Sequence, residues 1–200
     1  AATSSVANVN DAPSGSVTIS GTATEDETLT AVTGTIVDED GLGSFSYQWN
    51  RAGIAISGAT SASYTQTQAD VGSVLTVTAS YTDGQGSGES VSSEATGSVV
   101  NVNDAPIGSV TISGTAVEDE VLTAVNTLSD EDVLGTITYT WSNGTIGETT
   151  TLGQTDVGSV LSVTASYTDG QGSGESVSSE ATGSVVNVND APIGSVTISG

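Results

Sequence analysis

The sequence repeats itself along its length. The hexapeptide Asn-Val-Asn-Asp-Ala-Pro occurs at 8–13, 101–106 and 187–192, at spacings of 93 and 86 residues. Residues 71–114 match residues 157–200 with one difference, Thr76 against Ser162. Near-identity at the spacing of a small domain indicates tandem copies of one folding unit.

The repeat divides the chain into two whole units and two partial ones. We expect residues 1–10 to end a preceding repeat, 11–102 and 103–188 to be complete repeats, and 189–200 to begin a third. Relative to the first unit, the second lacks one residue between its acidic triplets and six between Trp141 and Asp156. The chain therefore reads as a segment of a longer array.

Within each unit, apolar and polar residues alternate with the period of a β-strand. In the first unit the alternation predicts strands at 16–20, 28–32, 45–49, 63–65 and 74–81, and a closing strand over 90–102 with a break at Gly97. No helix of useful length is visible. Short strands at this density, with Trp49 or Trp141 on the third strand, are typical of an immunoglobulin-type sandwich. We therefore predict an all-β fold of tandem immunoglobulin- or cadherin-like β-sandwich domains in an extended array.

The charge balance excludes several functions. The chain has 24 acidic side chains against one basic side chain, and its net charge is −23. Nucleic acid and anionic membrane surfaces require clustered Lys and Arg, so we expect neither as a partner. Cys and His are absent, which excludes disulfides, thiolate or imidazole nucleophiles and Cys/His zinc sites. No apolar run reaches the length of a membrane span, and no signal-peptide pattern opens the sequence, so we expect no direct membrane insertion.

The acidic residues concentrate in links and turns, and the sandwich topology sorts them into three groups, one for each junction between units. The middle group combines the link with turns from both units, and each outer group combines a link with turns from one unit. The upstream candidates are Asn10, Asp11, Asp38, Asp40 and Asp83; the middle ones are Glu25, Asp26, Glu27, Asp70, Asn103, Asp104, Asp130, Asp132 and Asp169; the downstream ones are Glu118, Asp119, Glu120, Asp156, Asn189 and Asp190.

Such groups of carboxylates repel one another, at about 1 kcal/mol per pair 4 Å apart in water. A divalent cation reverses the sign of this interaction. Oxygen-only ligands in flexible geometry favour Ca²⁺, which takes 6–8 oxygens, over the strictly octahedral Mg²⁺. The sequence therefore predicts Ca²⁺ at each junction. The alternative is that these Asp and Asn side chains serve only their own turns, by hydrogen-bonding the local backbone.

The linker and turns carry two family resemblances. Asn101–Pro106 resembles the inter-domain calcium linker of cadherins, although it opens with Asn101 in place of Asp and lacks the second linker Asn. Asp38/Asp40 and Asp130/Asp132 fit the cadherin Asp-x-Asp pair. The whole unit, with its link, acidic triplets, Trp strand and Tyr-Thr-Asp-Gly turn in order, is similar to the immunoglobulin-like repeats of giant bacterial surface adhesins, which are exported by type I secretion and often carry RTX repeats. No RTX nonapeptide is present here.

The adhesin resemblance implies an extracellular, cell-surface stalk that is stiffened by Ca²⁺ and presents a distal binding region. The partners would be neighbouring repeats of the same chain. Two alternatives stay open: a self-assembling filament with homotypic strand pairing through an unpaired strand at 195–199, and a glycan- or surface-binding module using the Ser/Thr faces. Paired carboxylates could also serve a glycosidase, but few aromatic residues are available to hold a sugar, and we predict no enzyme.

Overall fold

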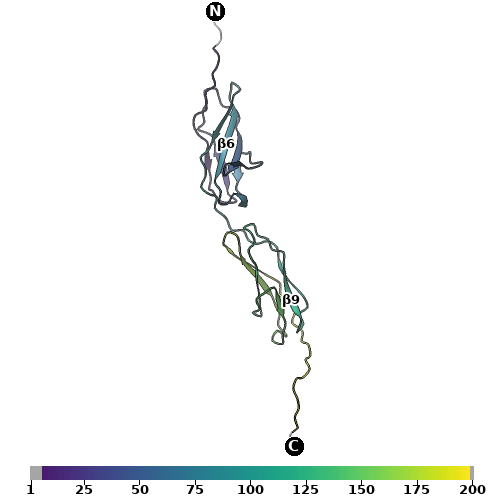
Figure 1. Cartoon of the computed structure of the whole chain (residues 1–200). Helices are drawn as coiled ribbons and strands as arrows, with labels where there is room; N and C mark the ends of the chain where they lie inside the picture. The colour runs from purple at the N-terminus through teal and green to yellow at the C-terminus, as the bar shows by residue number, and fades with distance from the viewer. Residues whose placement is uncertain (1–5, 199–200) are drawn as a thin grey trace, which may run out of the picture. The chain divides into compact units, whose positions relative to one another are not determined.

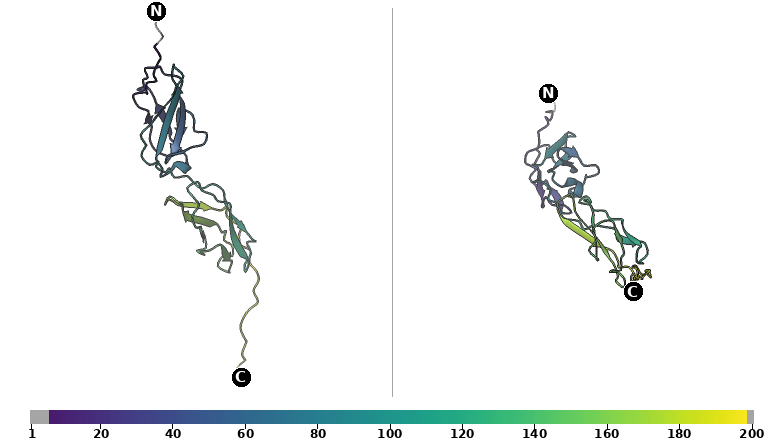
Figure 2. Two further views of the ribbon diagram at one scale, coloured as in Figure 1. Left: turned by 45° about the horizontal axis from the view of Figure 1, so that its top comes forward. Right: turned by 60° about the horizontal axis from the view of Figure 1, so that its bottom comes forward.

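The structure, a computed structural model, describes residues 6–198. The chain divides into two compact units, Ala1–Val102 and Asn103–Gly200. Each unit is a two-layered antiparallel β-sandwich (Figure 1), and Figure 2 shows the layers of each unit from two further directions. The predicted all-β, immunoglobulin-like fold is confirmed. Parts of the two predicted partial repeats, residues 1–5 and 199–200, lie outside the described residues.

Unit 1 packs a sheet of order β1-β2-β5 against a sheet of order β4-β3-β6-β7. Its elements are β1 (Thr18–Ser20), β2 (Thr28–Val32), β3 (Ser46–Arg51), β4 (Ile54–Ala55), β5 (Ser63–Thr65), the one-turn 3₁₀ helix η1 (Gln68–Asp70), β6 (Leu75–Thr82) and β7 (Gly88–Ser92). Alternation along β6 buries Leu75, Val77 and Ala79 completely, and Trp49 of β3 lies fully buried in the same core. The core therefore follows the period-two pattern.

Unit 2 repeats this plan with sheets of order β11-β9-β8 and β10-β12-β13. Its strands are β8 (Val110–Ser113), β9 (Val121–Asn126), β10 (Thr138–Trp141), β11 (Thr149–Thr151), β12 (Val163–Thr168) and β13 (Gly174–Ser178). A single bridge between Thr140 and Ile146 stands in place of β4, because the six missing residues fall there. The core of unit 2 is built around Trp141, Leu122 and Leu161.

The closing strand of unit 1 differs from the prediction. β7 ends at Ser92, well short of the predicted residue 102. From there the hydroxyls of Ser93 and Thr96 accept from the N–H groups of Val77 and Leu75, where a regular ladder would use carbonyls. Isolated parallel bridges then join Val99 to Val71 and Val100 to Thr24. This path carries the end of the unit across to the turn before β2.

The segment at 195–199, predicted as an unpaired strand, has no strand pairing in its described part. Residues 195–198 form no strand, and Val196 and Ile198 are 96% and 94% exposed. Figure 1 draws this segment in yellow leading away from unit 2. In units 1 and 2 the same sequence pairs with β2 or β9.

Candidate metal centres

Each unit carries an Asp-x-Asp turn between the second and third strands of its sandwich. The N–H of Asp40 donates to Oδ1 of Asp38 at 2.9 Å, and the N–H of Asp132 donates to Oδ1 of Asp130 at the same distance. An aspartate favours a turn because its side chain accepts from the backbone two residues further on. Both carboxylates of each pair are thus fixed on one turn.

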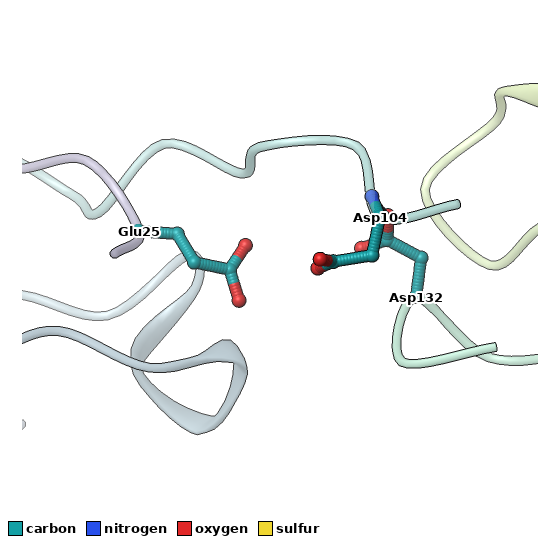
Figure 3. A group of neighbouring side chains, drawn as sticks. All are labelled: Glu25, Asp104 and Asp132. Atoms are coloured by element: carbon teal, nitrogen blue, oxygen red, sulfur yellow. Dashed lines mark hydrogen bonds between the residues drawn. The ribbon is translucent and has the colours of Figure 1, made fainter. Parts of the chain in front are cut away.

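The link that enters each unit is hydrogen-bonded to this turn. The N–H of Asp11 donates to Oδ2 of Asp40 at 2.9 Å, and the N–H of Asp104 donates to Oδ2 of Asp132 at 2.8 Å. In unit 2 a carboxylate oxygen of Asp104 also lies within 4.8 Å of one of Asp132, and Figure 3 shows these two side chains next to each other. The structure therefore brings three predicted residues of unit 2, Asp104, Asp130 and Asp132, to one end of that unit.

A second acidic contribution comes from the hairpin before β7 or β13. Oδ1 of Asp83 accepts from the N–H groups of Gln85 and Ser87, and Oδ1 of Asp169 accepts from Gln171 and Ser173, all at 2.8 Å. The other oxygen, Oδ2, is buried in both aspartates and has no hydrogen-bond partner among residues 6–198. A buried carboxylate oxygen without a donor is costly, so these two atoms are the ones most in need of a cation.

Glycine allows this hairpin to approach the Asp-x-Asp turn. The N–H of Gly84 donates to the carbonyl of Asp40 at 3.0 Å, and a Cβ on Gly84 would lie 2.5 Å from that carbonyl oxygen. Gly170 stands in the same relation to Asp132 in unit 2, with its N–H at 2.8 Å. Backbone contact of this kind requires glycine on the hairpin.

A buried tyrosine completes the cluster. The hydroxyl of Tyr81 donates to Oδ2 of Asp38 at 2.6 Å, and that of Tyr167 donates to Oδ2 of Asp130 at 2.5 Å. Burial, followed by the hydrogen bond to Asp38 or Asp130 and the nearby negative charges, raises the pKa of both tyrosines well above the ordinary value. For Asp83, burial alone would raise the pKa, but donation from the N–H groups of Ser87 and its neighbours outweighs it, so the pKa lies below its ordinary range.

The opposite end of each unit presents a buried glutamate. Oε2 of Glu25 accepts from the N–H of Val102 at 3.1 Å, and Oε2 of Glu118 accepts from the N–H of Val188 at 3.0 Å. The two glutamates are only 2% and 3% exposed. In Figure 3 the Glu25 side chain extends from its turn with its carboxylate at the tip. Each unit therefore has a glutamate at its exit and an aspartate cluster at its entrance.

Several other predicted ligands are exposed and do not contact these clusters. The remaining residues of the two triplets, Asp26, Glu27, Asp119 and Glu120, are exposed. Asp26 and Asp119 adopt positive φ of 61° and 67°, a conformation that Asp tolerates in turns. Asn189 and Asp190 are exposed in a segment without regular structure.

The structure gives Asp70 and Asp156 a different role from the predicted one. Asp70 is completely buried: Oδ1 accepts from Nε of Arg51 at 2.7 Å, and Oδ2 accepts from Tyr64 and Thr67. Burial opposes ionisation, but these donors outweigh it and lower the pKa of Asp70. In unit 2, Asp156 accepts from Asn143 and from the N–H of Gly153. Both aspartates cap the turn before the long strand, and we withdraw them as ligands.

Two glutamates near the clusters were missed by the sequence analysis. Nδ2 of Asn10 donates to Glu89 at 2.8 Å, and Nδ2 of Asn103 donates to Glu175 at 2.9 Å. The predicted ligands Asn10 and Asn103 thus tie the link to β7 or β13. The strand register could have shown this, because Glu89 pairs with Tyr81 and Glu175 with Tyr167 across adjacent strands.

The donor set suits a hard cation. Each entrance cluster offers oxygen ligands alone, from carboxylates and neighbouring carbonyls, and each exit offers the glutamate. These are the ligands that Ca²⁺ and Mg²⁺ take in proteins, and they lack the nitrogen and sulfur that zinc sites use. Among the described residues, no helix is long and apolar enough to cross a membrane.

Neither a protein-family model nor a curated protein sequence matches the chain. Similar solved structures include three N-terminal domains of the outer capsid protein Hoc of bacteriophage RB49, at 17% identity over 82% of this chain with a TM-score of 0.32. A Ca²⁺-stabilized adhesin with which an Antarctic bacterium binds ice matches at 15% identity over 90% of the chain with a TM-score of 0.34.

A tetra-tandem repeat from the extending region of a large adhesion protein matches at 25% identity over 86% of the chain with a TM-score of 0.30. The chain spans 58% of the phage structure and 50% of each adhesin structure.

Proposed function

We propose that this chain is part of the stalk of a large bacterial cell-surface adhesin, in which Ca²⁺ joins consecutive units and holds a distal binding region away from the cell. The observation that carries the proposal is the repetition of two half-sites. Glu25 and Glu118 stand at the exits, and Asp38/Asp40 and Asp130/Asp132 stand at the entrances, with the same hydrogen bonds in both units.

In this proposal, the short covalent link lets the exit of one unit and the entrance of the next share an ion. Glu25 is bound to the N–H of Val102, and Asp132 is bound to the N–H of Asp104. Two residues of extended chain span at most about 7 Å. Glu25 and Asp132 are hydrogen-bonded to N–H groups only two residues apart, so their carboxylates could share one cation or bind two adjacent ones.

The energetics favour an ion at this place. Without one, each pair of carboxylates about 4 Å apart costs on the order of 1 kcal/mol even in water, and more where the groups are buried. A bound Ca²⁺ turns this repulsion into attraction. Extracellular calcium modules bind at roughly 10⁻⁴–10⁻³ M, so such links would be filled outside a cell.

The composition supports a mechanical role in an extracellular setting. The chain has no Cys, so its sandwiches need no oxidising step to fold, and its strong negative charge opposes binding to anionic surfaces. Near-identical units are what a spacer requires, because length then depends on copy number. Extracellular exposure also supplies the calcium that the links need.

Small-angle scattering of the intact chain tests the proposal. With millimolar CaCl₂ we expect a narrow distribution of lengths, and after EGTA a broader and shorter one, since the two units would then be joined only by a flexible link. Glu25→Gln should reproduce much of the EGTA effect in calcium. Profiles that are the same with calcium and with EGTA would refute calcium stiffening.

A further inference from the structure

The buried tyrosines at the entrance clusters touch the proposed ligands without facing solvent. Tyr167 is 6% exposed and belongs to the hydrophobic core that contains Trp141 and Val163. Its hydroxyl donates to Oδ2 of Asp130 at 2.5 Å. Tyr81 repeats the contact with Asp38, and its ring meets Phe45 edge-on with 5.2 Å between ring centroids. Core packing therefore holds each ring in one position, and this sets the position of its hydroxyl group.

The hydrogen bonds form a chain from the core to the link. Tyr167 donates to Oδ2 of Asp130, whose Oδ1 accepts from the N–H of Asp132; Oδ2 of Asp132 in turn accepts from the N–H of Asp104. A carboxylate oxygen has two acceptor positions, so one donor on each oxygen of Asp130 leaves a position on each for a cation. The carboxylate is held in one orientation and still has room for a ligand.

A second observation at the same place points to a ligand. Oδ2 of Asp169, on the hairpin packed against the Asp-x-Asp turn, is buried with no hydrogen-bond partner in the part of the chain that the structure describes. Asp83 repeats this in unit 1. Both clusters thus contain an oriented carboxylate from the turn and an unsatisfied one from the hairpin.

We infer that Tyr167 and Tyr81 are positioning residues of these cation sites: each orients the first carboxylate of its Asp-x-Asp pair from the hydrophobic core and so ties ion affinity to the packing of its own unit. The inference rests on the proposed function, since it concerns the same site. Outer partners that orient metal ligands are often worth about 10- to 100-fold in affinity.

Calorimetric titration of the full-length chain with CaCl₂, after removal of calcium, tests the inference at Tyr167→Phe. We expect the affinity of the link site to fall by about tenfold. The matched control is Tyr64→Phe, which also removes a Tyr-to-Asp hydrogen bond, the one to the turn-capping Asp70. That variant should stay within about twofold of the unmodified chain, which would show that loss of a buried Tyr-to-Asp hydrogen bond away from the entrance cluster does not lower calcium affinity.

Near-UV absorption of the tyrosines provides a second measurement that does not depend on folding of the variant. Calcium added to the unmodified chain should perturb the spectrum of the buried tyrosines through Asp130. Full calcium affinity in Tyr167→Phe, or calcium binding with no change in the tyrosine spectrum, would overturn the positioning role. If the unmodified chain binds no calcium, the proposed function itself fails.

Discussion

Val133 is a β-branched residue in a backbone conformation that suits glycine. Its φ is 76°, and its counterpart in unit 1, Gly41, has a φ of 90°. The left-handed region costs a residue with a Cβ about 1–2 kcal/mol, and a branched Cβ fits it worst. The strained residue directly follows Asp132, so the strain that lowers the stability of unit 2 lies at its candidate metal centre.

We predict that Val133→Gly stabilises unit 2. Relief of strain should exceed the added entropy of glycine in the unfolded chain, for a net gain of about 1 kcal/mol. Hydrogen exchange of peptides from β10 and β12 would report this as slower exchange, and the reciprocal Gly41→Val should speed exchange in β3 and β6. Faster exchange in Val133→Gly would show that the backbone conformation at this position is not strained.

The buried tyrosines predict a loss of stability at alkaline pH. Tyr81 and Tyr167 have raised pKa values in the folded chain, so above about pH 10 the unfolded chain releases protons that the folded chain keeps. The free energy of unfolding should then fall as pH rises, by up to about 1.4 kcal/mol per pH unit for each tyrosine. Below about pH 10 both tyrosines are protonated in the folded and the unfolded chain, so their full contribution to the free energy of unfolding is present there.

Urea unfolding at increasing pH would measure this decline, and absorbance would follow tyrosine ionisation in parallel. We expect two tyrosines to ionise only together with unfolding. If all five tyrosines titrate near pH 10 while circular dichroism stays unchanged, the hydroxyls of Tyr81 and Tyr167 are not buried against carboxylates.

Side-chain hydroxyl groups accept hydrogen bonds from backbone N–H groups at the start of β6 and just before β12. Leu75 donates its N–H to Oγ1 of Thr96 at 2.9 Å, and Leu161 donates to Thr182 at 3.0 Å. Thr96→Val keeps the shape of the side chain but leaves the N–H of a buried residue without an acceptor. We expect a loss of about 1–3 kcal/mol in the free energy of unfolding of unit 1, measured by urea titration.

Thr78→Val is the matched control for that strand. It removes the contact between the Thr78 and Ser92 hydroxyls on the outer face, at 2.9 Å, and leaves every backbone pair of β6 intact. Surface changes of this kind usually stay within about 0.5 kcal/mol. Equal losses in the two variants would mean that the Thr96 hydroxyl is not an essential acceptor.

The strands could be predicted from alternation, and the exceptions have local causes. Residues 28–32 and 63–65 form strands with the predicted bounds, because apolar residues at every second position fit only one face of a sheet. Apolar and polar residues also alternate in the segment after Ser92. There, however, side-chain hydroxyls accept the hydrogen bonds in place of backbone carbonyls, and the alternation pattern cannot show this. Asp70 was predicted as a metal ligand because it lies in an acidic turn. Its sequence position does not show that Arg51 and Tyr64 hydrogen-bond to its carboxylate.

The two units differ in the middle of the sandwich, whereas the hydrogen bonds of their candidate metal centres are the same. The missing residues of unit 2 remove the edge strand β4, while the exit glutamate and the entrance turn keep the same hydrogen bonds as in unit 1. The middle of the sandwich therefore differs by the length of a strand, whereas the hydrogen bonds at its two ends are the same in both units, even though Val133 replaces Gly41 at the entrance. Compatible ends are enough to join such units, so repeats spaced by 93 and 86 residues can follow one another in one chain.

Glu25 and Glu118 provide a matched pair for testing the array as a whole. Both are buried and accept from the link, but the sequence after Val102 supplies Asp104, Asp130 and Asp132, whereas the described chain after Val188 supplies Asp190 alone. We predict that Glu25→Gln lowers the number of Ca²⁺ ions bound per chain and removes the rise in melting temperature that calcium gives through linkage.

Glu118→Gln should leave both quantities near those of the unmodified chain, because no Asp-x-Asp turn follows Val188 in the described part of the chain. Equilibrium dialysis counts the ions, and calorimetric melts in CaCl₂ and in NaCl of equal ionic strength separate binding from screening. The same calcium loss in both variants would show that each unit binds its ions alone. Calcium would then stabilise the sandwiches individually, and the stiffness of a stalk would have to come from the link itself.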